Sequence, residues 1–125
     1  RITRLTRNAV SLLLGFELAH LGINSGSPEN ALRDAKLLCD LLGWEVKEGN
    51  SSAFAGTAFE LMKKPFRGTH GHIAIRTNSI SRAKWHLSQR GYAFDEESAA
   101  VKNGKTIAIY LKEEIAGFAL HLLQK

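Results

Sequence analysis

Gly71-His72-Ile73-Ala74-Ile75 is a short apolar stretch interrupted by one histidine, and three other stretches of the chain share this pattern. They are Ala19-His20-Leu21-Gly22-Ile23, Phe59-Glu60-Leu61-Met62 and Leu120-His121-Leu122-Leu123. Side chains alternate between the two faces of a strand, so each polar residue faces away from its apolar neighbours. If the apolar face packs on helices, four metal-competent side chains share the opposite face: His20, Glu60, His72 and His121.

The residues that accompany these polar side chains on their face are small. They are Gly22, Ala58, Ala74 and Ala119. Small neighbours leave space for a ligand beside the polar groups. The four stretches therefore predict a metal site in a cup lined by a sheet.

The predicted elements occur twice in the same order, as strand, helix and three further strands. The first copy is predicted as a strand at 17–24, a helix at 30–42 and strands at 44–48, 53–55 and 58–63. The second copy is predicted as a strand at 71–77, a helix capped by Ser79 and ending at 89 or 90, and strands at 98–102, 105–112 and 117–123. His20 and His72 lie in the first strand of each copy, and Glu60 and His121 lie in the last. One internal repeat thus accounts for all four positions.

This repeat predicts an α+β fold in which paired βαβββ modules form a sheet-lined cup. Module one occupies residues 16–64 and module two occupies residues 69–125. Residues 1–15 are predicted as an N-terminal amphipathic helix or linker, from the helical pattern of residues 3–14. Ser27 and Pro28 are a helix start signal and Gly43 is a stop signal, while Asn103-Gly104 suits a type I′ hairpin turn.

Composition narrows the class of protein. The chain has 125 residues, 44% of them hydrophobic and 23% charged, as in a single globular domain. No apolar run approaches the roughly 18 residues of a membrane span, so we expect no membrane partner. The single cysteine, Cys39, excludes an internal disulfide framework, and we expect a cytoplasmic location. The net charge is +5, but the basic residues are scattered, so we expect no nucleic-acid partner.

Three imidazoles and one carboxylate suit a divalent zinc, nickel, iron, cobalt or manganese ion better than calcium or magnesium. The alternative is that each of these residues is an ordinary strand residue that is hydrogen-bonded or exposed. For any one residue alone we would favour that alternative. Four ligand-competent residues at repeat-related positions favour the metal site.

Two further side chains are candidates for binding a substrate. Arg76 shares the strand parity of His72, so its guanidinium could hold a carboxylate or phosphate in the cup. Asn24 shares the parity of His20. The alternatives are that Arg76 reaches solvent from a strand end and that Asn24 forms a turn.

The four quoted stretches, together with Gly117-Phe118-Ala119-Leu120-His121, resemble the vicinal oxygen chelate superfamily, which includes glyoxalase I, bleomycin-resistance proteins and extradiol dioxygenases. The resemblance covers about residues 16–125. It implies a glyoxalase-like fold whose divalent metal is held by ligands from the first and last strands of each module. Glyoxalase I usually has a glutamate where this chain has His121, so the resemblance implies related chemistry rather than glyoxalase activity itself.

With its N-terminal helix, the chain also resembles the glyoxalase-like C-terminal extension of some bacterial 2-keto-3-deoxy-6-phosphogluconate / 4-hydroxy-2-oxoglutarate aldolases. The residues that extend this resemblance are those from Leu5 to Phe16. It implies a bacterial protein with a preceding aldolase domain. A chain that begins at Arg1 fits the expectation of a fragment of such a protein.

Two functions follow from these patterns. The first is a metal-dependent lyase or isomerase acting on a small 2-oxo or 2-hydroxy acid or aldehyde, by bidentate chelation and enediolate stabilisation. Glu60 is the only carboxylate among the four predicted site residues, and it would act as a ligand or as a catalytic base. The second is a non-catalytic binding or assembly module appended to the aldolase. Open sheet edges and module exchange in the family lead us to expect a homodimer.

Overall fold

The computed structural model describes the backbone from Arg4 to Lys125 and the side chains from Ala9 onward. Three helices and eight strands follow one another along these residues. Their order is α1 (Arg4–Leu14), β1 (Glu17–Asn24), α2 (Pro28–Leu42), β2 (Val46–Glu48), β3 (Ser52–Ala55), β4 (Phe59–Met62), β5 (Gly71–Thr77), α3 (Ile80–Gln89), β6 (Phe94–Lys102), β7 (Lys105–Leu111) and β8 (Phe118–Gln124). Thr3, the first residue of the predicted N-terminal helix, lies outside the described residues.

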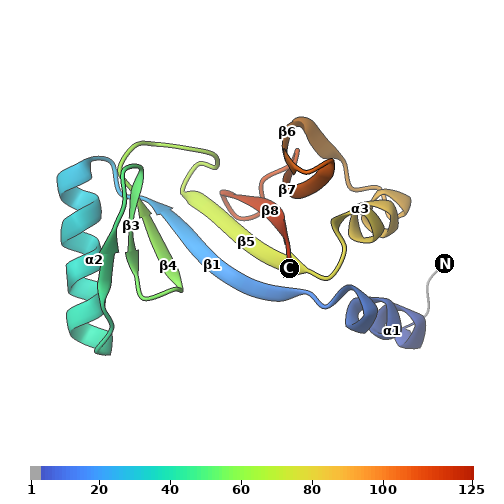
Figure 1. Cartoon of the computed structure of the whole chain (residues 1–125), viewed down its shortest axis with the longest axis horizontal. Helices are drawn as coiled ribbons and strands as arrows, with labels where there is room; N and C mark the ends of the chain where they lie inside the picture. Colours follow the sequence, from blue (N-terminus) through green and yellow to red (C-terminus); the bar gives the residue numbers. More distant parts are fainter. Residues whose placement is uncertain (1–3) are drawn as a thin grey trace.

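The strands form one sheet in the order β2-β3-β4-β1-β5-β8-β7-β6. Each βαβββ module contributes four neighbouring strands, and the modules join where β1 and β5 pair antiparallel. The last strand of each module runs parallel to its first, in the pairs β1–β4 and β5–β8. Figure 1 shows α2 against the first module and α3 with α1 at the opposite end of the sheet. The predicted α+β fold of paired modules is therefore confirmed.

Local signals explain where α2 begins and ends. The Ser27 hydroxyl accepts a hydrogen bond from the Asn30 backbone N–H at 3.0 Å, and Pro28 occupies the first turn. Gly43 ends the helix in the left-handed region, with φ of 73°. The Trp44 backbone N–H also donates to the Cys39 carbonyl, so the next strand begins at Val46 rather than at the predicted residue 44.

In the second module the hairpin turn forms as predicted, but β6 is longer than predicted. Asn103 and Gly104 both have positive φ, 52° and 77°, as a type I′ turn requires. β6 begins at Phe94 instead of at residue 98. The sequence pattern does not indicate the start of β6, because this segment carries three consecutive acidic residues and has a bulge in its pairing. It therefore lacks the alternation of apolar and polar residues that is typical of a strand.

The outer face of each half of the sheet has its own apolar core under a helix. The first core is formed by buried residues of α2 and of the strands beside it, namely Ala31, Ala35, Cys39, Ala53, Ala55 and Leu61. The second joins α1 and α3 to β6, β7 and β8 through Leu14, Ile80, Ala83, Phe94, Ile109, Leu111 and Leu122. The predicted polar side chains lie on the opposite, concave face. Among the described residues, no helix is long and apolar enough to cross a membrane.

Candidate metal centre

Strand register brings two of the predicted ligands to either side of one glycine. Gly22 of β1 pairs with Glu60 of β4 on one side and with His72 of β5 on the other. Residues that pair directly across a sheet point to the same face. Glu60 and His72 therefore project from one face, and the residue between them, Gly22, has only a hydrogen atom as its side chain.

The second module repeats this arrangement around one alanine. Ala74 of β5 pairs with His20 of β1 on one side and with His121 of β8 on the other. Ala74 follows His72 by two residues, just as Gly22 follows His20. The two cross-strand rows are thus related by the internal repeat and run side by side across the centre of the sheet.

The small residues in these rows are required by space. A side-chain methyl built on Gly22 would overlap the imidazole ring of His72. Ala74 is completely buried between its two histidine neighbours. The small companions predicted from strand parity therefore make room for the polar side chains themselves.

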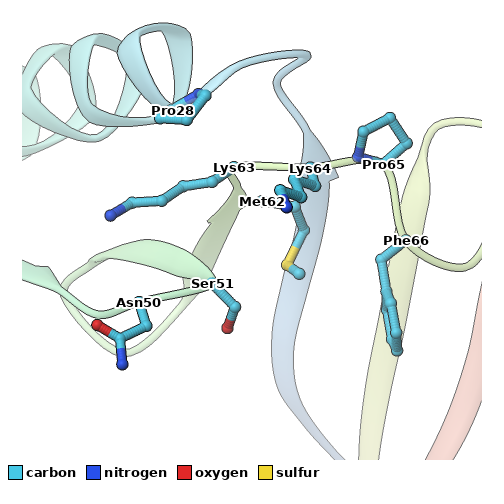
Figure 2. Close-up of a pocket in the computed structure, with 8 residues that line it drawn as sticks. All are labelled: Pro28, Asn50, Ser51, Met62, Lys63, Lys64, Pro65 and Phe66. Atoms are coloured by element: carbon cyan, nitrogen blue, oxygen red, sulfur yellow. The ribbon is translucent and has the colours of Figure 1, made fainter.

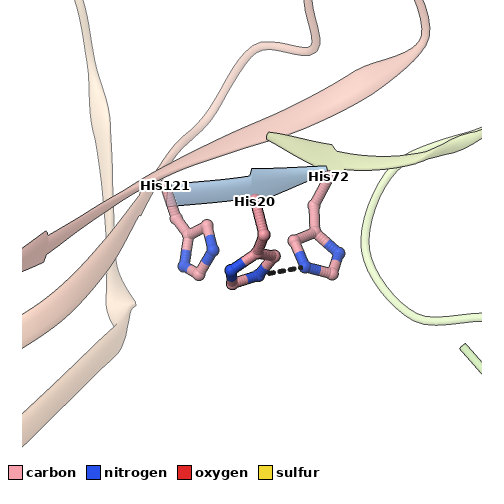
Figure 3. Close-up of side chains that lie close together, drawn as sticks. All are labelled: His20, His72 and His121. Carbon is pink, nitrogen blue, oxygen red and sulfur yellow. Dashed lines mark hydrogen bonds between the residues drawn. The ribbon is translucent and has the colours of Figure 1, made fainter. Parts of the chain in front are cut away.

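We call His20, Glu60, His72 and His121 the quartet. One nitrogen from each of its three histidines lies within 4.8 Å of the other two. Figure 3 shows the three rings hanging side by side from β1, β5 and β8. The Nε2 atoms of His20 and His72 are 3.3 Å apart, and Oε1 of Glu60 is 3.3 Å from the first and 3.0 Å from the second.

The distances among His20, His72 and Glu60 fit the edges of a coordination shell. Ligand atoms about 2.0–2.1 Å from one ion stand about 3.0 Å apart at right angles and about 3.4 Å apart at the tetrahedral angle. Both nitrogens of His121 and Nδ1 of His72 are buried and have no hydrogen-bond partner among the described residues. Buried polar atoms are normally paired, so these unpaired nitrogens are available to bind a cation.

The charge states of Glu60 and His121 also suit metal binding. Hydrogen bonds to His20 and His72 hold the pKa of the Glu60 carboxyl well below its usual range, and burial opposes this effect only in part. Burial, with the charges of His72 and His20 adding to it, lowers the pKa of His121 to about 4. A carboxylate and a neutral imidazole are the forms in which these residues bind metals.

Ser52, on β3, holds the second carboxylate oxygen. Its buried hydroxyl donates to Oε2 of Glu60 at 2.7 Å. This hydrogen bond orients the carboxylate so that Oε1 faces His20 and His72. Ser52 was not among the residues predicted from the sequence, because nothing in the strand pattern indicates which serine lies beside Glu60.

Aromatic rings flank the quartet at equivalent places in the two modules. Phe54 pairs with Glu60, and Tyr110 pairs with His121. The Tyr110 and His121 rings stack at a centroid distance of 4.4 Å and an angle of 9°. Burial raises the pKa of Tyr110 to about 12, so this phenol stays protonated. Extending the repeat to the third strand of each module could have found this pair of aromatic residues.

Arg67 lies on the other side of the Tyr110 ring. Its guanidinium carbon is 4.7 Å from the ring centroid, and its Nη1 is 3.0 Å from a carboxylate oxygen of Asp95. The side chain comes from the loop between β4 and β5, where the sequence analysis indicated only scattered basic residues. The stack of Arg67, Tyr110 and His121 therefore joins this loop to the quartet.

The predicted substrate-binding residues lie at two different ends of the cup. Arg76 is half-exposed, 3.7 Å from Glu17, and lines a pocket of about 460 Å³ together with His20. Asn24 donates its amide nitrogen to the Gly68 carbonyl at 3.1 Å. Its Oδ1 atom is buried and unpaired within the described chain. The structure thus places Arg76 in a pocket with His20, whereas Asn24 is bound to the loop at Gly68.

A different pocket lies where β4 leaves the sheet. It has a volume of about 420 Å³ and includes no member of the quartet. Figure 2 shows its lining side chains, with Lys63 and Phe66 pointing in different directions from the loop. The Lys63 ammonium group is already bound by Glu48 and by the Gly49 carbonyl. This pocket is therefore separate from the candidate metal centre.

Comparison with known proteins gives structural matches only. No protein-family model and no curated protein sequence matches the chain. A hypothetical protein from Bacillus halodurans C-125 has a similar structure, with a TM-score of 0.61, 16% identity, and coverage of 88% of this chain and 94% of that one. Methylmalonyl-CoA epimerase from Mycobacterium tuberculosis has a TM-score of 0.61 and 16% identity over 90% of this chain and 89% of that one.

A third match spans a smaller part of its partner. Homoprotocatechuate 2,3-dioxygenase from Arthrobacter globiformis has a TM-score of 0.55 and 16% identity, over 86% of this chain and 35% of that one. At such identities the likeness shows the fold alone. The chain has the glyoxalase-like fold of paired βαβββ modules, the fold of the vicinal oxygen chelate superfamily that its sequence resembles.

Proposed function

We propose that the quartet binds one divalent metal ion and that the chain is a metal-dependent lyase or isomerase of the glyoxalase-like type. The observation that carries this proposal is that His20, His72 and Glu60 meet at ligand spacing with His121 beside them, and that buried nitrogens here lack any partner among the described side chains. The neighbours with named activities include an epimerase and a dioxygenase, so the shared fold does not by itself choose a reaction.

When bound, a divalent ion supplies Lewis-acid polarisation of substrate oxygens and stabilises negative charge that develops on them. Three neutral imidazoles and Glu60 would hold it. Zinc, nickel, iron, cobalt and manganese all suit this donor set. The substrate class that we propose, a small 2-oxo or 2-hydroxy acid or aldehyde, presents two adjacent oxygens and so can chelate.

We assign Glu60 the role of a ligand through Oε1. Ser52 holds its other oxygen, and the lowered pKa of the carboxyl favours the charged form that binds a cation. A carboxylate whose pKa is lowered is a weak base. Proton transfer by Glu60 would therefore require it to leave His20 and His72 first.

The test is metal analysis of the protein purified without chelator. We expect about one equivalent of metal per chain, lost in the His72→Ala/His121→Ala variant. The matched control is His86→Ala, because His86 lies on α3, beside Trp85 and away from the quartet. Metal-free wild-type protein whose thermal stability does not change with added zinc, nickel or manganese would contradict the proposal.

One observation favours the second candidate, a non-catalytic module attached to an aldolase. Leu12 and Leu13 of α1 are 82% and 75% exposed, so the N-terminal helix presents apolar side chains that a preceding domain could cover. Solvent deuterium exchange at the carbon next to the carbonyl of pyruvate, followed by NMR, discriminates the two candidates. Bound metal without such exchange would favour the attached module. Dimerisation stays a prediction, and analytical ultracentrifugation would test it by measuring the oligomeric state.

A further inference from the structure

The pocket that opens on His20 lies over the concave face of the first module. Its volume of about 460 Å³ is large enough for a small metabolite. His20 is the member of the quartet that borders it. The other lining residues come from β2, β3, the turns beside them and β5, and include Lys47, Glu48, Phe54, Thr57 and Arg76.

Strand register places Lys47 on the same face as the quartet. Lys47 pairs with Phe54, Phe54 pairs with Glu60, and Glu60 pairs with Gly22, which continues the row to His72. Neighbouring strands lie about 4.8 Å apart, so the Lys47 backbone is about 10 Å from that of Glu60. The Phe54 ring lies between them and packs edge-on against the His20 ring at 5.5 Å. The pocket thus has an apolar floor between the metal centre and a lysine.

The charge of the pocket is positive. Arg76 and Lys47 each contribute one cationic side chain to its wall. The acidic lining residue Glu48 is already bound by the Lys63 ammonium group at 2.8 Å. The partner of Arg76, Glu17, is 3.7 Å away and both side chains are about half exposed, so this ion pair is weak and leaves the guanidinium able to bind another anion.

Resting on the proposed metal centre, we propose that the substrate carries a second anionic group, a carboxylate or a phosphate, which Arg76 and Lys47 bind in this pocket. The chelating oxygens reach the quartet past His20, and the anionic end lies over Phe54. A guanidinium fork and an ammonium group are the usual partners of both anions. The proposal therefore narrows the substrate class from any small 2-oxo acid to those with a further acidic group.

The test compares 2-oxo acids with and without that group. Calorimetric titration of zinc-loaded protein uses 2-oxoglutarate, 2-oxopentanoate, which lacks the second carboxylate, and phosphohydroxypyruvate, which carries a phosphate instead. We expect one of the two ligands with a second anionic group to bind at least tenfold more tightly than 2-oxopentanoate. In Arg76→Gln/Lys47→Gln this preference falls below about twofold, while zinc content stays at the wild-type level. Arg82→Gln is the control, because Arg82 lies on α3, on the other face of the sheet.

A second measurement separates failure of this inference from failure of the metal centre. Chelator-treated protein is titrated with glutarate and with inorganic phosphate and followed by amide NMR shifts. We expect the shifts to cluster at Lys47, Thr57 and Arg76 and to vanish in the double variant. Zinc binding without any preference for a ligand with a second anionic group would overturn the inference and leave the metal centre standing. Amide shifts on addition of glutarate or phosphate, in a protein that binds no zinc, would overturn the metal centre and leave the anion site standing.

Discussion

Gly22 lies so close to His72 that any side chain at this position would overlap the imidazole ring. The glycine is needed for space, since its backbone conformation is one that other residues adopt. It separates Glu60 from His72 in the sheet and lets the two side chains meet above it. The approach of these two ligands therefore depends on the absence of a single methyl group.

Gly22→Ala should displace the His72 ring and weaken zinc binding. Overpacking of this kind costs roughly 1–3 kcal/mol of unfolding free energy. We expect urea denaturation to show that loss and calorimetry to show a zinc affinity at least tenfold lower. Gly49→Ala is the matched control, because an added methyl there meets only one backbone oxygen at 3.4 Å. Wild-type zinc affinity in Gly22→Ala would refute the spatial argument.

Ser52→Ala should release Oε2 of Glu60 and loosen the carboxylate. Removing a group that orients a metal ligand typically weakens metal binding roughly 10- to 100-fold. We expect a loss in this range in a competition assay with a zinc chelator. Ser51→Ala serves as the comparison, because Ser51 is exposed and lies one residue away. Equal zinc affinities in the two variants would show that Ser52 does not position Glu60.

Tyr110→Ala and Tyr110→Phe should behave differently, because the ring stacks on His121 and the hydroxyl is not part of that stack. Truncating a buried aromatic residue to alanine costs roughly 3–5 kcal/mol. We expect that loss of stability, together with weaker zinc binding, in Tyr110→Ala. Tyr110→Phe should keep both within experimental error. A large loss of zinc affinity in Tyr110→Phe would instead give the hydroxyl a direct role.

The stability of the metal-free protein should fall in mild acid. Burial lowers the pKa of His121 from its ordinary 6.5 to about 4 in the folded chain. Between these values the unfolded chain binds more protons than the folded chain, so stability decreases as pH falls through this window. The expected loss between about pH 7 and pH 5 is roughly 2 kcal/mol.

The measurement is urea denaturation of chelator-treated protein at both pH values. His121→Phe should remove most of this dependence, because it cannot be protonated. The lowered pKa of Glu60 acts in the same direction but only below its ordinary value of 4.5, where the carboxyl of the unfolded chain takes up protons. An unchanged pH dependence in His121→Phe would show that another group is responsible.

The paired modules could be predicted from sequence because the strand and helix periodicities occur twice in the same order of elements. The parity of His20, Glu60, His72 and His121 was enough to place them on one face, and the register then brings them together. Their role as ligands stays a prediction. The internal symmetry also reaches further than the sequence pattern indicated, since Phe54 and Tyr110 occupy equivalent places beside the last strands.

The supporting residues were not predictable for a physical reason. Ser52 and Lys47 lie in strands whose register depends on turns and bulges, and a shift of one residue would move each to the other face. Arg67 lies in a loop, where no periodicity fixes the direction of a side chain. Tertiary contacts alone identify these residues as neighbours of the quartet.

X-ray absorption spectroscopy at the zinc edge of the zinc-loaded protein tests the central claim most directly. We expect a first shell of nitrogen and oxygen atoms at about 2.0–2.1 Å, with the scattering pattern of three imidazoles. In His121→Ala the imidazole contribution should fall to two. A shell without imidazole scattering, or one that is unchanged in His121→Ala, would contradict the proposed metal centre.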